Sequence, residues 1–141
     1  MSKMIHYLLI FLLFVMSCYV AAFDYYTLSM QWPPSFCIFS TKKCRPSSIH
    51  DTTFRVHGLW PSNINGEQPR ACIVPSKSLP VRMLPERDIP VNLRTDLDLF
   101  WPNFYLHGDN YDFWSVQWNV HGTCSHYPTM PLHYQGQFWR L

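Results

Sequence analysis

The chain has 141 residues and a mass of 16.8 kDa, which is enough for one modest domain and too little for two independent ones. Apolar residues make up 48% of it and charged residues only 14%, which excludes an intrinsically disordered protein. The formal net charge is +2, and no more than two basic residues are adjacent. This excludes a protein that binds a polyanion by charge density alone, so any nucleic-acid chemistry must come from a specific site.

The first 22 residues have the pattern of a secretory signal peptide. Lys3 precedes an apolar run over 7–16, and the run is followed by the small residues Ala21 and Ala22, which suit cleavage. The alternative is a membrane anchor, which needs roughly 18 to 20 apolar residues and is disfavoured by the shorter run. We therefore expect an exported, extracellular protein without stable membrane association, whose single domain spans residues 23–141.

The cysteine count agrees with export. Cys18 leaves with the signal peptide, and the four cysteines that remain are Cys37, Cys44, Cys72 and Cys124. The oxidising secretory route favours disulfides over free thiols, and four cysteines allow three pairings.

A zinc site is the alternative use of these cysteines. His121, Cys124 and His126 provide three candidate ligands, but their spacing matches no common zinc finger and the ligand set is incomplete. We therefore expect no bound metal.

The hydrophobic pattern after residue 23 predicts two strands and a long loop. Alternating apolar and aromatic residues predict a strand over 25–32, which a Pro-Pro pair ends. A second strand is predicted over 52–59, where the alternation places His57 on the side opposite Val56. The stretch over 61–90 is rich in proline and is predicted to be mostly loop.

Two helices are predicted further along the chain. Asn92 is a candidate N-cap for the first, which Pro102 ends. Its apolar residues recur at helical spacing: Leu93, Leu97, Phe100 and Trp101. The second helix, over 111–120, brings four residues along one side: Phe113, Trp114, Gln117 and His121.

Two segments, 54–61 and 113–124, carry the chemical signal. Each has a His-Gly pair close to aromatic residues, with His57 in the first and His121 in the second. Two imidazoles can work as complementary base and acid near neutral pH, because the unperturbed pKa of histidine is about 6.5. Such a pair suits phosphodiester transfer. Spacing alone leaves open the alternative that one or both histidines are structural.

Longer motifs surround both histidines. They read His57-Gly58-Leu59-Trp60-Pro61, Phe113-Trp114 to His121-Gly122-Thr123-Cys124, and, before them, Phe23-Asp24-Tyr25-Tyr26 and Gln31-Trp32-Pro33-Pro34. Together these motifs resemble the T2-type ribonucleases, particularly the plant secreted branch that includes the self-incompatibility S-RNases. The resemblance covers about residues 23–126. It implies an α+β fold in which helices pack on a central antiparallel sheet.

The resemblance also implies a reaction without metal or other cofactor. A ribose 2′-hydroxyl of single-stranded RNA attacks the adjacent phosphorus, and a 2′,3′-cyclic phosphate forms. By analogy His121 is the general base and His57 the general acid. Trp60 helps to shape the site, with packing in the core as an equal alternative, and Gln31 is a candidate contact to a base. The implied disulfides join Cys37 to Cys44 and Cys72 to Cys124.

Several positions depart from the family pattern. The family carries His, Glu and Lys where this chain has Val116, Gln117 and Val120. Gln117 remains a catalytic candidate because its amide donates a neutral hydrogen bond, whereas the Val120 side chain donates nothing. We therefore expect weakened cleavage, since one lost donor at a reacting phosphate costs roughly 10² to 10³ in rate.

A further departure is length, because family members continue well beyond the second segment whereas this sequence has 17 residues after Cys124. The expectation is a domain shortened at its C-terminus. Three functions stay open: a secreted endoribonuclease, an inactive relative that binds RNA or a protein partner, as in pollen–pistil recognition, and a product without function. The sequence has no Asn-x-Ser/Thr sequon, so N-glycosylation is not expected.

Overall fold

The computed structural model describes residues 23–72 and 86–126 and has an α+β fold, which confirms the fold class implied by the sequence. The expectations for the signal peptide and for the C-terminal tail lie outside these residues. The elements in chain order are β1 (Tyr25–Gln31), α2 (Pro33–Phe39), α3 (Pro46–Ile49), β2 (Arg55–Ser62), η2 (Glu86–Asp88), α4 (Val91–Phe100), α5 (Asn110–Val120) and η3 (Gly122–Cys124).

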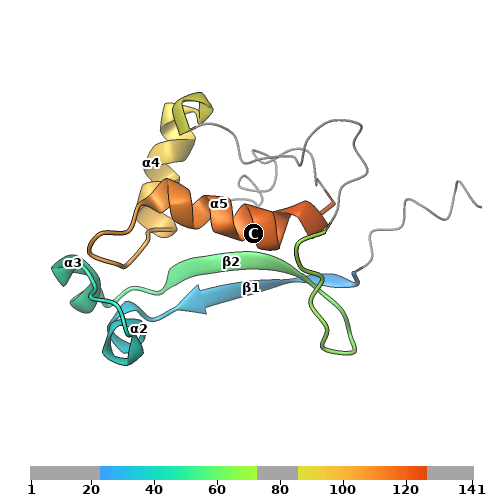
Figure 1. Ribbon diagram of the computed structural model, residues 1–141, viewed down its shortest axis with the longest axis horizontal. Helices are drawn as coiled ribbons and strands as arrows, with labels where there is room; N and C mark the ends of the chain where they lie inside the picture. Colours follow the sequence, from blue (N-terminus) through green and yellow to red (C-terminus); the bar gives the residue numbers. More distant parts are fainter. Residues whose placement is uncertain (1–22, 73–85, 127–141) are drawn as a thin grey trace, which may run out of the picture.

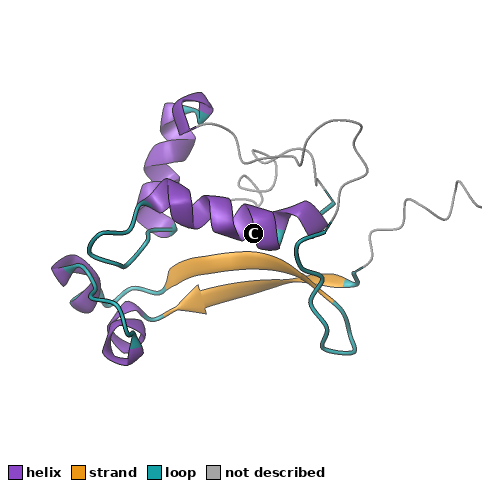
Figure 2. Ribbon diagram, in the orientation of Figure 1, coloured by secondary structure: helices purple, strands orange, loops and turns teal. Residues whose placement is uncertain are grey.

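The two strands form an antiparallel sheet, and α5 runs along it (Figure 1). Helices α2 and α3 lie together at one end of the sheet, and α4 crosses behind one end of α5 (Figures 1 and 2). The pairing register shifts in the middle of the sheet, where Ser29 pairs with Gly58 and Met30 pairs with Val56. His57 is thus an extra residue in β2, a β-bulge of the kind that re-aims a side chain.

The bounds predicted for the second strand were wrong by three residues. The prediction was 52–59, whereas β2 spans Arg55–Ser62, and Phe54 lies before it. Pro61 lies inside the strand and pairs with Tyr26. An antiparallel strand accommodates proline because only alternate residues direct their N–H groups toward the neighbouring strand.

Helix α4 also begins earlier than predicted. Its N-cap is Pro90 rather than Asn92, and no side chain caps its first turn. Leu97 and Trp101 are buried as the helical spacing predicted, but Phe100 is exposed. Only a narrow apolar stripe of α4 therefore faces the core.

Helix α5 is held at its start by Asp109. The Asp109 carboxylate accepts hydrogen bonds from the backbone N–H groups of Tyr111 and Asp112, which have no partners within the helix. The helix covers the predicted range 111–120 and begins one residue earlier. Its buried residues include two tryptophans and the amide of Gln117.

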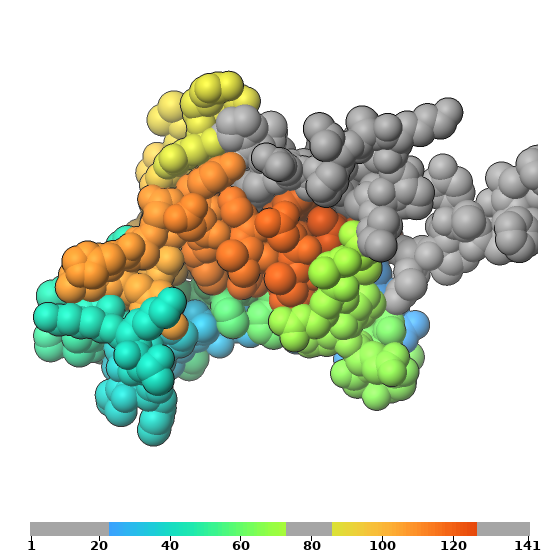
Figure 3. All heavy atoms as spheres, viewed as in Figure 1, coloured from blue at the N-terminus to red at the C-terminus, as the bar shows by residue number. Residues whose placement is uncertain are grey.

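The core lies between α5, α4 and the sheet. Its buried members are Ile89, Leu97, Trp101, Trp114 and Trp118. In the view of Figure 3 the atoms of α5 lie between those of α4 above and those of the sheet below. The end of α4 also reaches β2, where the Arg55 side chain donates to the Leu99 carbonyl. Among the helices of the described residues, none has the length and apolar character needed to cross a bilayer.

Candidate active site

His57 is fixed in the sheet by a chain of indole hydrogen bonds. The Trp101 indole N–H donates to the backbone carbonyl of His57 at 2.8 Å, and the Trp114 indole N–H donates to the carbonyl of Trp101 at 2.7 Å. Both indoles are buried, so the two hydrogen bonds are shielded from water. They tie α5 to the end of α4, and the end of α4 to the bulge that carries His57.

Trp60 contacts both imidazoles. Its ring meets that of His57 edge-on at a centroid distance of 5.0 Å and stacks on that of His121 at 4.8 Å with an interplanar angle of 20°. Glycine is required at position 58, because a Cβ there would lie 2.2 Å from the indole nitrogen of Trp60. The structure thus brings His57, Trp60 and His121 together, although they come from two distant segments.

Gln117 joins this group from the last turns of α5. Its side-chain oxygen accepts a hydrogen bond of 3.2 Å from the indole N–H of Trp60, and its backbone carbonyl accepts one from the N–H of His121. The amide therefore fixes the Trp60 ring against His121. Its NH₂ group provides two further donors.

His121 caps the C-terminus of α5 and is buried, with 4% of its surface exposed. Its Nδ1 atom is enclosed and has no hydrogen-bond partner among the residues that the structure describes. Such an orphaned ring nitrogen is costly in a site that is only structural.

Burial weakens both histidines as bases. It lowers the pKa of His57 below the ordinary value, because the charged imidazolium loses solvation. The pKa of His121 falls to about 4, through burial first, then the positive charge of Arg70, then His57. His121 is therefore neutral over most of the pH range in which proteins are stable.

A cavity of about 760 Å³ opens on the His57 side of this group. Gln31 and His57 both line it, together with Phe113. Trp60, Gln117 and His121 are not among its lining residues. The sequence-predicted residues therefore form two groups: Trp60, Gln117 and His121 lie outside the cavity lining, and Gln31 and His57 lie at the cavity wall. His57 links the two groups through its contact with Trp60.

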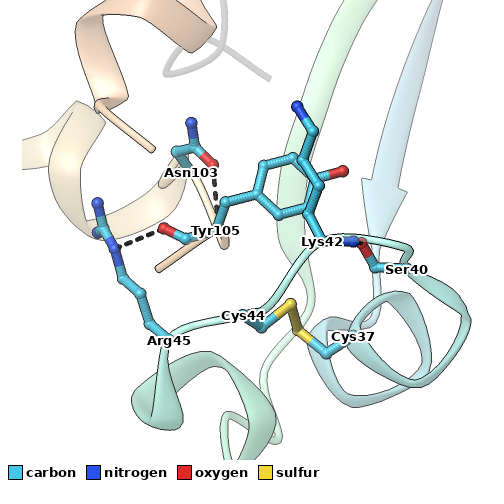
Figure 4. Close-up of a disulfide and its surroundings, with 7 residues drawn as sticks. All are labelled: Cys37, Ser40, Lys42, Cys44, Arg45, Asn103 and Tyr105. Carbon is cyan, nitrogen blue, oxygen red and sulfur yellow. Dashed lines mark hydrogen bonds between the residues drawn. A yellow bond between two sulfur atoms is a disulfide. The ribbon is translucent and has the colours of Figure 1, made fainter. Parts of the chain in front are cut away.

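Lys42 and Lys43 also line this cavity, and the sequence reasoning missed both. Their loop is closed by the Cys37–Cys44 disulfide, beside which Lys42 lies against the Tyr105 ring (Figure 4). A pair of adjacent lysines between two cysteines was the available signal.

The structure joins Cys37 to Cys44 and Cys72 to Cys124, the pairing that the family resemblance implies. Because Cys124 is in a disulfide, it is not free to bind zinc with His121 and His126. Within 23–72 and 86–126, no three His, Cys, Asp or Glu residues are grouped as metal ligands.

Residues 23–140 match the model of the Ribonuclease T2 family. The chain belongs to this family. It is 32% identical over 136 residues to Ribonuclease S-4 of Pyrus pyrifolia, an alignment that covers 95% of this chain and 55% of the relative. The chain thus spans about half the length of the curated relatives it matches.

Solved ribonucleases share the fold. The crystal structure of Japanese pear S3-RNase matches with a TM-score of 0.64 and 30% identity, over 84% of this chain and 54% of that one. RNase NT, solved in complex with 5′-AMP, matches with a TM-score of 0.60 and 30% identity, over 84% and 56%.

Proposed function

We propose that this protein is a secreted endoribonuclease that cleaves single-stranded RNA by transphosphorylation and leaves 2′,3′-cyclic phosphate ends. The observation that carries the proposal is the contact of both His57 and His121 with the Trp60 ring, in a chain of the Ribonuclease T2 family. The proposed reaction uses proton transfer between imidazoles, with no cofactor.

His121 is the proposed general base. As a neutral imidazole it accepts the proton of the ribose 2′-hydroxyl, and the 2′-oxygen then attacks the adjacent phosphorus. Its pKa of about 4 keeps it neutral and ready to accept a proton.

His57 is the proposed general acid. It donates a proton to the 5′-oxygen as the P–O5′ bond breaks, which yields a cyclic phosphate and a free 5′-hydroxyl. The base must be neutral while the acid is protonated, and groups in environments that separate their pKa values meet this requirement. The pKa of His57 is lowered by burial, and that of His121 by burial and two positive neighbours.

The cavity next to His57 is the proposed site for a nucleotide base. Gln31 offers an amide that both donates and accepts, as base edges require, and Phe113 offers an aromatic wall. A base can enter this cavity only when it is unstacked, which favours single-stranded RNA. The 5′-AMP complex of the related RNase NT is consistent with nucleotide binding.

The decisive experiment measures cleavage of a short single-stranded RNA by the full chain in the presence of a chelator. His57→Ala and His121→Ala should each lower the rate by roughly 10² to 10⁴, the usual contribution of general acid–base catalysis. His50→Ala, which removes an exposed histidine, is the matched control and should leave the rate unchanged. Activity that a chelator abolishes, or that survives both substitutions, would overturn the mechanism.

A second candidate function is RNA binding without turnover. It is favoured by the neutral amide of Gln117 and the apolar side chain of Val120, which provide no charge to a reacting phosphate. Binding of RNA without formation of cyclic-phosphate ends would decide for this candidate. Binding of a protein partner in pollen–pistil recognition is likewise a function without turnover. A binding assay with pollen proteins tests it.

Export is also part of the proposal. The signal-like pattern of residues 1–22 and the two disulfides support it. Expression in a eukaryotic host should release a protein into the medium whose N-terminal sequence begins at Phe23. Retention in the cell membrane with Met1 intact would contradict the signal peptide.

A further inference from the structure

The segment that follows β2 returns to the end of α5. The backbone N–H of Ala71 donates to the carbonyl of Val120 at 2.8 Å, and the N–H of Cys72 donates to the sulfur of Cys124 at 3.2 Å. The Cys72–Cys124 disulfide lies next to these bonds. In the space-filling view this segment lies against the end of α5 (Figure 3). Arg70 directly precedes Ala71, and His121 directly follows Val120, so this hydrogen bond brings the backbones of Arg70 and His121 close together.

The backbone of Ala71 has an unusual conformation. Its φ of 49° lies in the left-handed region, which non-glycine residues rarely adopt. Such strained residues cluster at ligand clamps and active sites, where the surroundings hold them in place. Here the hydrogen bond to Val120 and the disulfide at Cys72 are those surroundings.

The charge of Arg70 is uncompensated within the described residues. Its side chain is exposed and takes part in no hydrogen bond or ion pair there. The other described arginines have partners: Arg45 with the carbonyls of Tyr105 and Gly108, Arg55 with Asp51, Arg87 with Asp88, and Arg94 with Glu86 and Asp98. A guanidinium without an anion is thus available for an anionic ligand.

The positive charge of Arg70 acts on His121. After burial, the positive charge of Arg70 is the next largest cause of the lowered pKa of His121. The hydrogen bond from Ala71 to Val120 and the disulfide at Cys72 hold the residue next to Arg70 against the end of α5, so the Arg70 side chain starts near His121. Val120, which directly precedes His121, has no polar side-chain atom with which to bind that phosphate.

We propose that Arg70 is the phosphate-binding residue of this site and holds the scissile phosphate of RNA beside His121. This inference rests on the proposed function. A guanidinium presents donors in a planar fork that matches two phosphate oxygens, and its charge stabilises the negative charge that develops on them during transfer. Arg70 thus supplies, from the loop after β2, a cation that α5 itself does not carry next to His121.

Phosphate binding has a measurable consequence for His121. An anion bound to Arg70 offsets the positive charge that disfavours the imidazolium, so the pKa of His121 rises. The test titrates the full secreted chain with inorganic phosphate and follows the ring signals of His121 by NMR. The wild-type protein should show saturable shifts of the His121 signals and a raised pKa.

Arg70→Gln tests the residue itself, and Arg87→Gln is the matched control. Arg87 is 85% exposed and pairs only with the neighbouring Asp88, so its substitution removes the same charge elsewhere on the surface. Arg70→Gln should weaken phosphate binding about tenfold, as expected for one charge-assisted contact, and should raise the pKa of His121 without phosphate. Arg87→Gln should change neither quantity.

Arg70→Lys distinguishes charge from fork geometry and should retain part of the affinity. The inference is overturned if phosphate does not shift His121 in the wild-type chain, or if all variants bind phosphate equally. It stands, while the proposed catalysis fails, if phosphate binding depends on Arg70 but no RNA is cleaved. Where RNA is cleaved, Arg70→Gln should lower kcat/KM by at least about tenfold, and Arg87→Gln should not.

Discussion

At the scale of single residues, the site depends on what surrounds two identical side chains. His57 projects from a bulge at the wall of a cavity, whereas His121 lies under the Trp60 ring with one ring nitrogen enclosed. The two imidazoles therefore have different surroundings. Different surroundings separate the pKa values of two identical groups, as is required when one is neutral and the other protonated at the same pH.

The first prediction concerns the pH dependence of cleavage. The base His121 must be neutral, so activity falls as the pH drops toward its pKa of about 4. The acid His57 must be protonated, and its lowered pKa makes activity fall as the pH rises past a value below about 6.5. The profile of kcat/KM for RNA should therefore be bell-shaped with an acidic maximum. A maximum above pH 7 would contradict the assignment of acid and base.

The second prediction concerns the charge that α5 lacks. Gln117→Glu together with Val120→Lys places a carboxylate four residues before His121 and an ammonium beside it, where charge develops on the phosphate. The cleavage rate should rise about tenfold or more, which corresponds to about 1.4 kcal/mol. The carboxylate introduced by Gln117→Glu can still accept the indole hydrogen bond of Trp60, so the packing is preserved.

Unfolding curves show whether a variant without a gain in rate is still folded. No gain in a protein that still unfolds cooperatively means that the phosphate is held elsewhere than beside position 120. The same substitution in an Arg70→Gln background should give a larger relative gain than in the wild-type chain, because the two cations serve one phosphate.

At the scale of elements, the sequence predicted those strands and helices whose apolar residues recur with the period of the element itself. The strand over 25–32 and the helix over 111–120 were predicted almost to their ends, because alternation marks the strand and side chains recurring along one side mark the helix. Helices α2 and α3 went unpredicted. Each begins with proline, and a proline that ends one element also suits the first turn of a helix, where its missing N–H is not needed.

The site was predictable only in part, because local sequence patterns do not record irregular backbone or contacts between distant segments. The two His-Gly motifs pointed to His57 and His121, and the structure brings both into contact with the Trp60 ring. The bulge at His57 breaks the two-residue period of a strand, so no alternation could indicate it. Arg70 is brought near His121 by a long-range backbone contact between their neighbours Ala71 and Val120, which leaves no mark in the local sequence.

The third prediction compares the two disulfides. Cys72–Cys124 spans 52 residues and Cys37–Cys44 spans 7, so the first removes more conformational freedom from the unfolded chain. Replacing each pair with serine should lower the free energy of unfolding by about 4 and about 2 kcal/mol respectively, measured by urea denaturation. Equal losses would mean that strain or residual structure, rather than loop length, sets the effect.

The same variants report on function. Loss of Cys72–Cys124 frees the segment that carries Arg70 and should weaken phosphate binding, whereas loss of Cys37–Cys44 frees only the loop of Lys42 and Lys43. Phosphate affinity that depends on Cys37–Cys44 more than on Cys72–Cys124 would place the anion at the lysine loop instead.

At the scale of the whole molecule, the described residues form one core with the site on its sheet side. The chain spans 55% of Ribonuclease S-4 of Pyrus pyrifolia, and within that span both histidine segments and both disulfides are present. The +2 net charge gives little general attraction for RNA. Binding must therefore depend on a few cations placed along the site.

The last prediction follows from this sparse charge. If Arg70, Lys42 and Lys43 are the residues that meet phosphates, the logarithm of RNA affinity should fall with the logarithm of salt concentration at a slope of about −2, given about 0.7 per neutralised phosphate on a single strand. Fluorescence anisotropy of a labelled RNA with the His57→Ala chain measures this slope without cleavage. Replacing both lysines with glutamine should reduce its magnitude by about 1.4, and Arg87→Gln should leave it unchanged. A slope beyond about −4 would show that RNA is held by many scattered charges, which is the binding mode that the composition argues against.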